Sequence, residues 1–191
     1  MVRKLPGFIV AVSIFLTFIQ AFPACAEEQP PRQWPSSHLT LKNIHDYLLK
    51  NRWNLDPIEG IWNYSERQIW QRKESETESI SLENVYQIAI VRQDLQSSDS
   101  FQAVIVSSKF DDWNFPGRIK ANFTHSGQEG VYTARWFGGD YHVFTSLFVL
   151  DQDKRQLTGA FQLHGDKGRI VSRVTIRKTF PANHIRISEL H

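Results

Sequence analysis

Cysteine is almost absent from this chain, because Cys25 is the only one among 191 residues. One cysteine cannot form an intramolecular disulfide, and the thiolate zinc sites need several. The folded part must therefore be stabilised by its hydrophobic core, which a chain of this length can build.

Recognisable catalytic motifs are also missing. The chain has no Gly-x-Ser-x-Gly, no His-Glu-x-x-His and no glycine-rich phosphate loop. The paired carboxylates Asp111–Asp112 and Asp151/Asp153 fall in expected turns, where aspartate usually accepts hydrogen bonds from its own backbone. We therefore predict that the protein is not an enzyme and that it holds no cofactor.

Histidines with metal-ligand spacing are few. Asp140 and His142 could meet His164 at one rim of a sheet, but zinc needs three or four converging ligands and the spacing does not bring them together. His125 falls in a turn. We predict no metal site.

Blocks of basic residues are absent as well. The formal charge is +2, and removing Arg3 and Lys4 with a leader brings it to zero. No basic stripe with interleaved aromatic residues is visible in the sequence, so we predict no nucleic-acid partner.

A long apolar run occurs only at the start of the chain. Arg3 and Lys4 precede the apolar residues 8–22, and Ala24-Cys25-Ala26 has the small-x-small pattern of a cleavage site. Residues 1–26 are predicted to be a signal peptide, with no stable membrane span and a periplasmic or secreted product. In the alternative, Cys25 is the lipidated residue of a lipoprotein.

The next segments differ in composition. Residues 27–37 carry three prolines and are predicted to be an extended linker. An amphipathic helix is expected over 38–52, because Leu41, Ile44 and Leu48 share one face and Thr40 can cap it. Residues 182–191 are predicted to be a C-terminal tail.

Short alternating segments separated by turn residues fill the range 53–181, which is typical of an antiparallel barrel. We predict a mainly β fold: an eight-stranded up-and-down barrel with one short N-terminal helix. The expected strands are Ile58–Ser65, Val85–Gln93, Phe101–Ser108, Arg118–Phe123, Val131–Phe137, Val143–Leu150, Gln156–His164 and Arg169–Lys178.

Alternation also predicts which side chains face inward. In the fourth expected strand Ile119, Ala121 and Phe123 should face the interior, and Arg118, Lys120 and Asn122 the solvent. The one long connection, Gln71–Asn84, is rich in glutamate and is read either as a solvated loop or as a lid over the barrel mouth.

The segment Leu55–Trp62, with its Gly60-Ile61-Trp62, resembles the opening of lipocalin-like, or calycin-type, β-barrels. More narrowly, its Leu-Asp-Pro-Ile-Glu-Gly-Ile-Trp run resembles the start of a bacterial family of small exported barrel domains. Lipocalin resemblance implies that an arginine from the last strand, Arg173 or Arg177, stacks on Trp62. The chain lacks the disulfides and the C-terminal helix of lipocalins.

Two functions remain open from the sequence. The barrel could carry a small apolar or amphipathic ligand in its lumen, or it could be a solid-core module of the envelope or secretome that binds a protein partner. Aromatic residues on strands either line a pocket or fill the core. The candidate ligand-binding residues are Trp62, Tyr86, Trp113, Tyr132, Trp136 and Arg177.

Overall fold

A computed structural model describes residues 34–72, 77–93, 99–109, 114–138, 142–165 and 168–181. The predicted signal peptide with Cys25, most of the predicted linker, the C-terminal tail, Trp113 and Asp140 lie outside these residues. The elements are α1 (Leu41–Lys50), β1 (Gly60–Arg72), β2 (Thr77–Arg92), β3 (Ser100–Ser108), β4 (Ile119–His125), β5 (Val131–Phe137), β6 (Val143–Leu150), β7 (Gln156–Gly165) and β8 (Gly168–Phe180).

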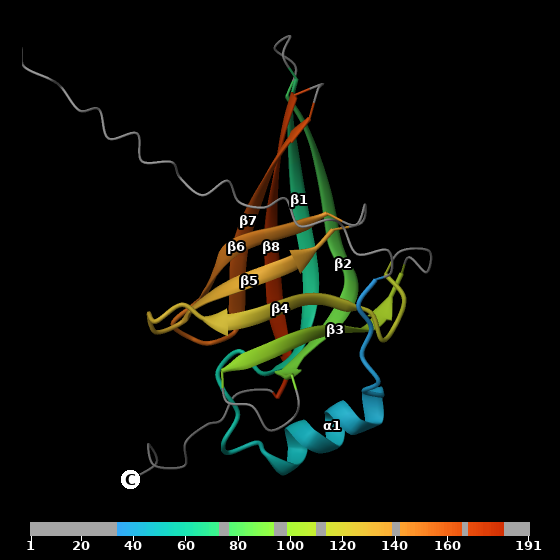
Figure 1. Cartoon of the computed structure of the whole chain (residues 1–191), viewed down its shortest axis with the longest axis vertical. Coiled ribbons are helices and arrows are strands. Elements are labelled where there is room, and N and C mark those ends of the chain that lie inside the picture. Colours follow the sequence, from blue (N-terminus) through green and yellow to red (C-terminus); the bar gives the residue numbers. More distant parts are fainter. Residues whose placement is uncertain are drawn as a thin grey trace, which may run out of the picture.

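The eight strands form one closed antiparallel barrel in sequence order, with β8 pairing back onto β1. This confirms the predicted fold class. Figure 1 shows α1 at one end of the barrel, beside β3, and the hairpins β1–β2 and β7–β8 rising past the other strands at the opposite end.

The helix covers the outside of the barrel rather than its interior. Thr40 caps it in a capping box with Asn43, and its buried residues Ile44 and Leu48 pack against Ile61, Ala89 and Val91. These three strand residues face away from the barrel lumen. The apolar stripe of α1 therefore explains why this part of β1 and β2 is apolar on both faces.

The predicted long connection is wrong for most of its length. β1 continues to Arg72, and β2 already begins at Thr77, so both the loop and the lid interpretations fail for the described part. Its polar composition suits a strand that is exposed on both faces, because residues 78–81 are all exposed and Ile80 is 48% exposed. A kink at Asn84, whose φ is 47°, separates this extension from the rest of β2.

The end of the predicted linker is part of the fold. Ser36 forms an antiparallel bridge with Arg118, and the Ile119 amide donates a hydrogen bond to the Pro35 carbonyl at 2.8 Å. Trp34 stacks on Arg118, with the guanidinium carbon 3.4 Å from the ring centroid. Residues 34–37 thus lie along the start of β4.

Candidate functional site

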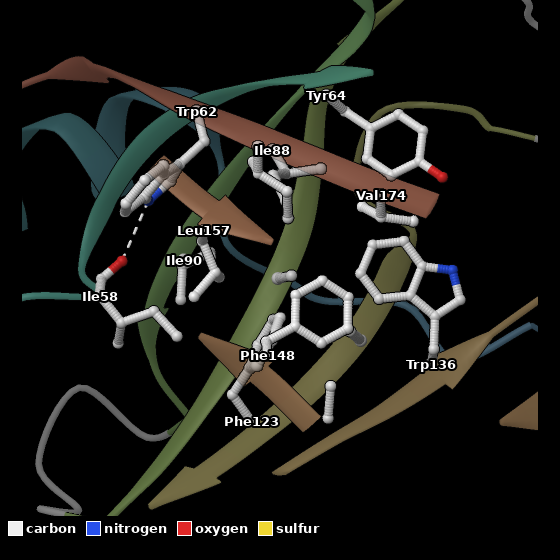
Figure 2. Close-up of a cluster of buried hydrophobic side chains, with 14 of the residues drawn as sticks. Ile58, Trp62, Tyr64, Ile88, Ile90, Phe123, Trp136, Phe148, Leu157 and Val174 are labelled. Atoms are coloured by element: carbon white, nitrogen blue, oxygen red, sulfur yellow. Dashed lines mark hydrogen bonds between the residues drawn. The ribbon is translucent and has the colours of Figure 1, made fainter. Parts of the chain in front are cut away.

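Trp62 closes the helix end of the barrel interior. The side chain is fully buried, and its indole N–H donates a 3.0 Å hydrogen bond to the Ile58 carbonyl (Figure 2). The cation over its ring is Lys178, whose Nζ lies 4.6 Å from the centroid. The implied arginine contact is wrong, because Lys178 pairs directly with Trp62 and shares its face while Arg177 and Arg173 face outward.

The middle of the lumen is filled by aromatic rings. Phe123 and Phe148 meet edge to face at 5.4 Å, and Phe148 lies 5.8 Å from Phe161. A Cβ placed on Gly159 would be 2.5 Å from the Phe148 ring. The inward-facing glycine therefore accommodates a ring rather than leaving room for a ligand at this level.

Three further rings stack above this layer. Tyr64 lies 4.2 Å from Tyr86 and 5.7 Å from Trp136, and Figure 2 shows Tyr64 and Trp136 at the end of the cluster away from Trp62. The Tyr64 hydroxyl donates a 2.6 Å hydrogen bond to Glu66. Burial raises the pKa of both tyrosines well above 10, so both stay neutral.

Two cations reach the interior from β4, contrary to prediction. Arg118 is fully buried and Lys120 is 6% exposed, whereas Ile119 is only partly buried. The register between β3 and β4 shifts at Val104 and Ile119, so a bulge at Lys120 reverses the expected alternation for residues 118–120, whereas Ala121 and Phe123 are buried as predicted. The Lys120 Nζ lies 5.6 Å from the ring centroids of both Tyr86 and Trp136.

A pocket of about 430 Å³ opens at the helix end, outside the packed core. Its central group is the Asp56 carboxylate. One oxygen accepts hydrogen bonds from the Ile58 amide at 3.0 Å and from the Tyr132 hydroxyl at 2.8 Å, and the other lies 3.1 Å from His125 Nε2. The Asp56 side chain therefore connects the segment before β1 to β4, through His125, and to β5, through Tyr132.

The pocket walls combine charged and apolar groups. Carboxylates outnumber lysines among the lining residues, which are Asp56, Pro57, His125, Glu129, Gly130, Tyr132, Leu150, Asp151, Gln152 and Lys154. The volume lies within the range of small-molecule sites, whereas most of the lining side chains are polar or charged.

Electrostatic effects around the pocket are strong. Burial, followed by the hydrogen bond to Asp56, raises the pKa of Tyr132, which keeps its hydroxyl a donor. Burial lowers the pKa of Lys178 to about 8, against the opposing attraction of Asp56 and Glu59. Lys178 Nζ donates a 2.5 Å hydrogen bond to the Pro57 carbonyl behind the pocket.

A fully buried carboxylate, Glu59, fixes the segment next to Asp56. It accepts hydrogen bonds from the Tyr47 hydroxyl at 2.6 Å and the Asp56 amide at 2.8 Å, and it lies 3.4 Å from Arg92 Nε. Tyr47 belongs to α1, so the helix position and the pocket geometry are linked through one side chain.

The predicted ligand residues do not form one site. Tyr132 lines the pocket, Trp62 closes the core beneath it, and Tyr86 and Trp136 lie together higher in the lumen. Arg177 is on the outer surface, and Trp113 is outside the described residues.

Sequence reasoning missed the groups around which the pocket is built. The sequence analysis does not single out Asp56, and it places His125 in a turn without a role. The available signal was the position of Asp56 inside the distinctive Leu55–Trp62 segment. Its contacts with His125 and Tyr132 depend on tertiary structure and left no local pattern.

The suggested Asp140/His142/His164 grouping is not established. His142 lies with its ring 6.2 Å from that of Phe144, while Asp140 and the His164 side chain lie outside the described residues. Among the residues that the structure describes, no three His, Cys, Asp or Glu side chains are grouped to hold a metal ion.

No protein family, curated protein or solved structure matches this chain. Its class therefore rests on the architecture: a closed eight-stranded antiparallel barrel, consistent with the calycin type, with a buried aromatic cluster. No helix of the described part is long and apolar enough to cross a membrane.

Proposed function

We propose that this protein is an exported, lipocalin-like barrel that binds a small amphipathic molecule, and that the pocket around Asp56 receives the polar end. The observation that carries the proposal is the 430 Å³ pocket built on Asp56, His125 and Tyr132. The packed rings of the middle lumen favour this rim position over the lumen itself.

The charge of the pocket favours a cationic group, such as a primary amine. Asp56, Glu129 and Asp151 line it, and Lys154 is the one lysine among the lining residues. Asp56 is held in position by Tyr132 and the Ile58 amide, so it would receive an ammonium without rearrangement.

The rest of the ligand would lie against apolar groups. Pro57, Leu150 and the ring of Tyr132 form one part of the wall. A short aliphatic or aromatic portion attached to the amine would be removed from water there, at about 25 cal/mol per Å² of apolar surface.

Native mass spectrometry of the protein purified without detergent from its natural host tests this proposal. We expect a stoichiometric added mass that is lost on denaturation, and that is lost or reduced in Asp56→Asn but retained in Asp46→Asn, which removes a charge from exposed α1. A bare mass, together with no binding of primary alkylamines by calorimetry, would contradict it.

The second candidate is a solid-core module that binds a protein partner. It is favoured by the aromatic packing, because Phe123, Phe148 and Phe161 fill the lumen where a carrier would hold its ligand. Capture of a single partner by both the wild type and Asp56→Asn, with no small-molecule mass, would support this alternative.

A further inference from the structure

The outer surface of β1, β7 and β8 carries a row of arginines. Arg169, Arg173 and Arg177 recur every fourth residue along β8, about 13 Å apart for a strand. Arg67 of β1 lies directly opposite Arg173. All four side chains are exposed.

These charges are not compensated by acidic residues on the outward positions of β1, β7 and β8. The arginine contacts on this face are to neutral amides: Arg169 donates to Gln162, and Arg177 to Gln156 at 3.4 Å. No Asp or Glu occupies the outward positions from Asn63 to Gln71 of β1, Gln156 to Gln162 of β7 or Arg169 to Arg177 of β8. None of the four arginines forms a salt bridge with a described residue.

Such an arrangement costs folding free energy. Like charges directly opposite on neighbouring strands, as Arg67 and Arg173 are, destabilise a sheet. The whole chain has a formal charge of only +2, so the concentration of positive charge is local. It is explained most simply by an anionic partner that covers this face.

Aliphatic side chains lie on the same face. Ile69 and Val171 pair with each other between the arginines. On β6, Leu147 is 58% and Val149 is 50% exposed, and Val149 aligns across the sheet with Thr158 and Thr175. We call this combination of Arg67, Arg169, Arg173, Arg177, Ile69, Val171, Leu147 and Val149 the arginine face.

We propose that the arginine face docks on a membrane surface of anionic phospholipid. Guanidinium groups bind phosphate oxygens with two parallel hydrogen bonds, and exposed aliphatic groups enter the boundary between headgroups and acyl chains. A soluble nucleic acid fits less well, because the outward positions from Gln156 to Gln162 of β7 and from Arg169 to Arg177 of β8 carry no aromatic ring for base stacking. This surface is separate from the Asp56 pocket, and the proposal does not depend on ligand binding.

Co-sedimentation with vesicles tests the proposal, using phosphatidylcholine alone and equal parts of phosphatidylcholine and phosphatidylglycerol. We expect binding only to the mixed vesicles, weakening as salt increases. In Arg169→Gln/Arg173→Gln the affinity should fall about five-fold for each arginine, which is about twenty-five-fold for the double variant. The control Lys42→Gln/Lys50→Gln, which removes the same charge from exposed α1, should bind like the wild type.

A second variant separates lipid from other polyanions. Leu147→Ser/Val149→Ser should weaken binding to the mixed vesicles while leaving the weaker, charge-driven attraction to a DNA duplex unchanged. Equal loss in the arginine and the lysine variants would overturn the proposal. The proposal would also be overturned if the protein bound the duplex more tightly than the vesicles and if Leu147→Ser/Val149→Ser left vesicle binding unchanged.

Discussion

Lys178, behind the pocket, has a pKa well below its ordinary value. It lies over the Trp62 ring and donates to the Pro57 carbonyl, and burial lowers its pKa to about 8. The folded protein therefore releases this proton near pH 8, whereas the unfolded chain holds it until about pH 10.5. Between these values the unfolded state binds more protons, so stability rises with pH.

The expected result is an increase in the free energy of unfolding between pH 8 and pH 10, on the order of 2 kcal/mol, measured by urea denaturation. In Lys178→Met the increase should disappear. Above about pH 10 the trend should reverse, because the raised pKa values of Tyr64 and Tyr86 mean that the unfolded chain ionises first. If the free energy of unfolding rose equally with pH in the wild type and in Lys178→Met, groups other than Lys178 would cause the increase.

Gly159 is the residue at which lumen packing can be tested. Its backbone would accept alanine, but the added Cβ would lie 2.5 Å from the Phe148 ring. Gly159→Ala should lower the free energy of unfolding by about 1–3 kcal/mol. Adding Phe148→Leu should make the double variant more stable than the sum of the two single effects. Additive losses would show that the lumen has room beside Phe148.

At the scale of elements, periodicity predicted all eight strands and the helix, because each buries one face. Val131–Phe137 and Val143–Leu150 have the predicted bounds. The strand structure of the polar half of the β1–β2 hairpin was not predicted. These parts of the two strands pair with each other beyond the packed barrel, so they need few apolar residues. The inward position of Arg118 and Lys120 was not predicted either. The bulge that causes it is defined by the pairing of β4 with β3, which the sequence of β4 alone does not show.

The packing of α1 on the barrel predicts different stability effects for two adjacent leucines of this helix. Leu48 is fully buried against the outside of β1 and β2, whereas Leu49 is 47% exposed. Leu48→Ala should cost about 2–5 kcal/mol of stability, with faster amide hydrogen exchange throughout α1. Leu49→Ala should change stability by less than about 0.5 kcal/mol. Equal effects would mean that α1 does not pack on the strands as described.

At the scale of the whole molecule, charge is unevenly distributed. Acidic groups gather around the pocket at the helix end, and arginines gather on the outer face of β1 and β8. Sequence reasoning found neither arrangement. The pocket joins Asp56 to His125 and Tyr132 from distant parts of the chain, and the arginine face combines Arg67 with residues of the last strand. Both sets are brought together by barrel closure.

The measurement that tests the central claim most directly is an NMR titration of the ¹⁵N-labelled protein with primary alkylamines. Binding at the proposed site should move the amide signals of Gly130, Tyr132 and Asp151, which line the pocket. The same shifts should be absent in Asp56→Asn and present in Asp46→Asn. No shift in the wild type, or shifts confined to Tyr86 and Trp136 in the lumen, would contradict the claim that the pocket around Asp56 is the ligand site.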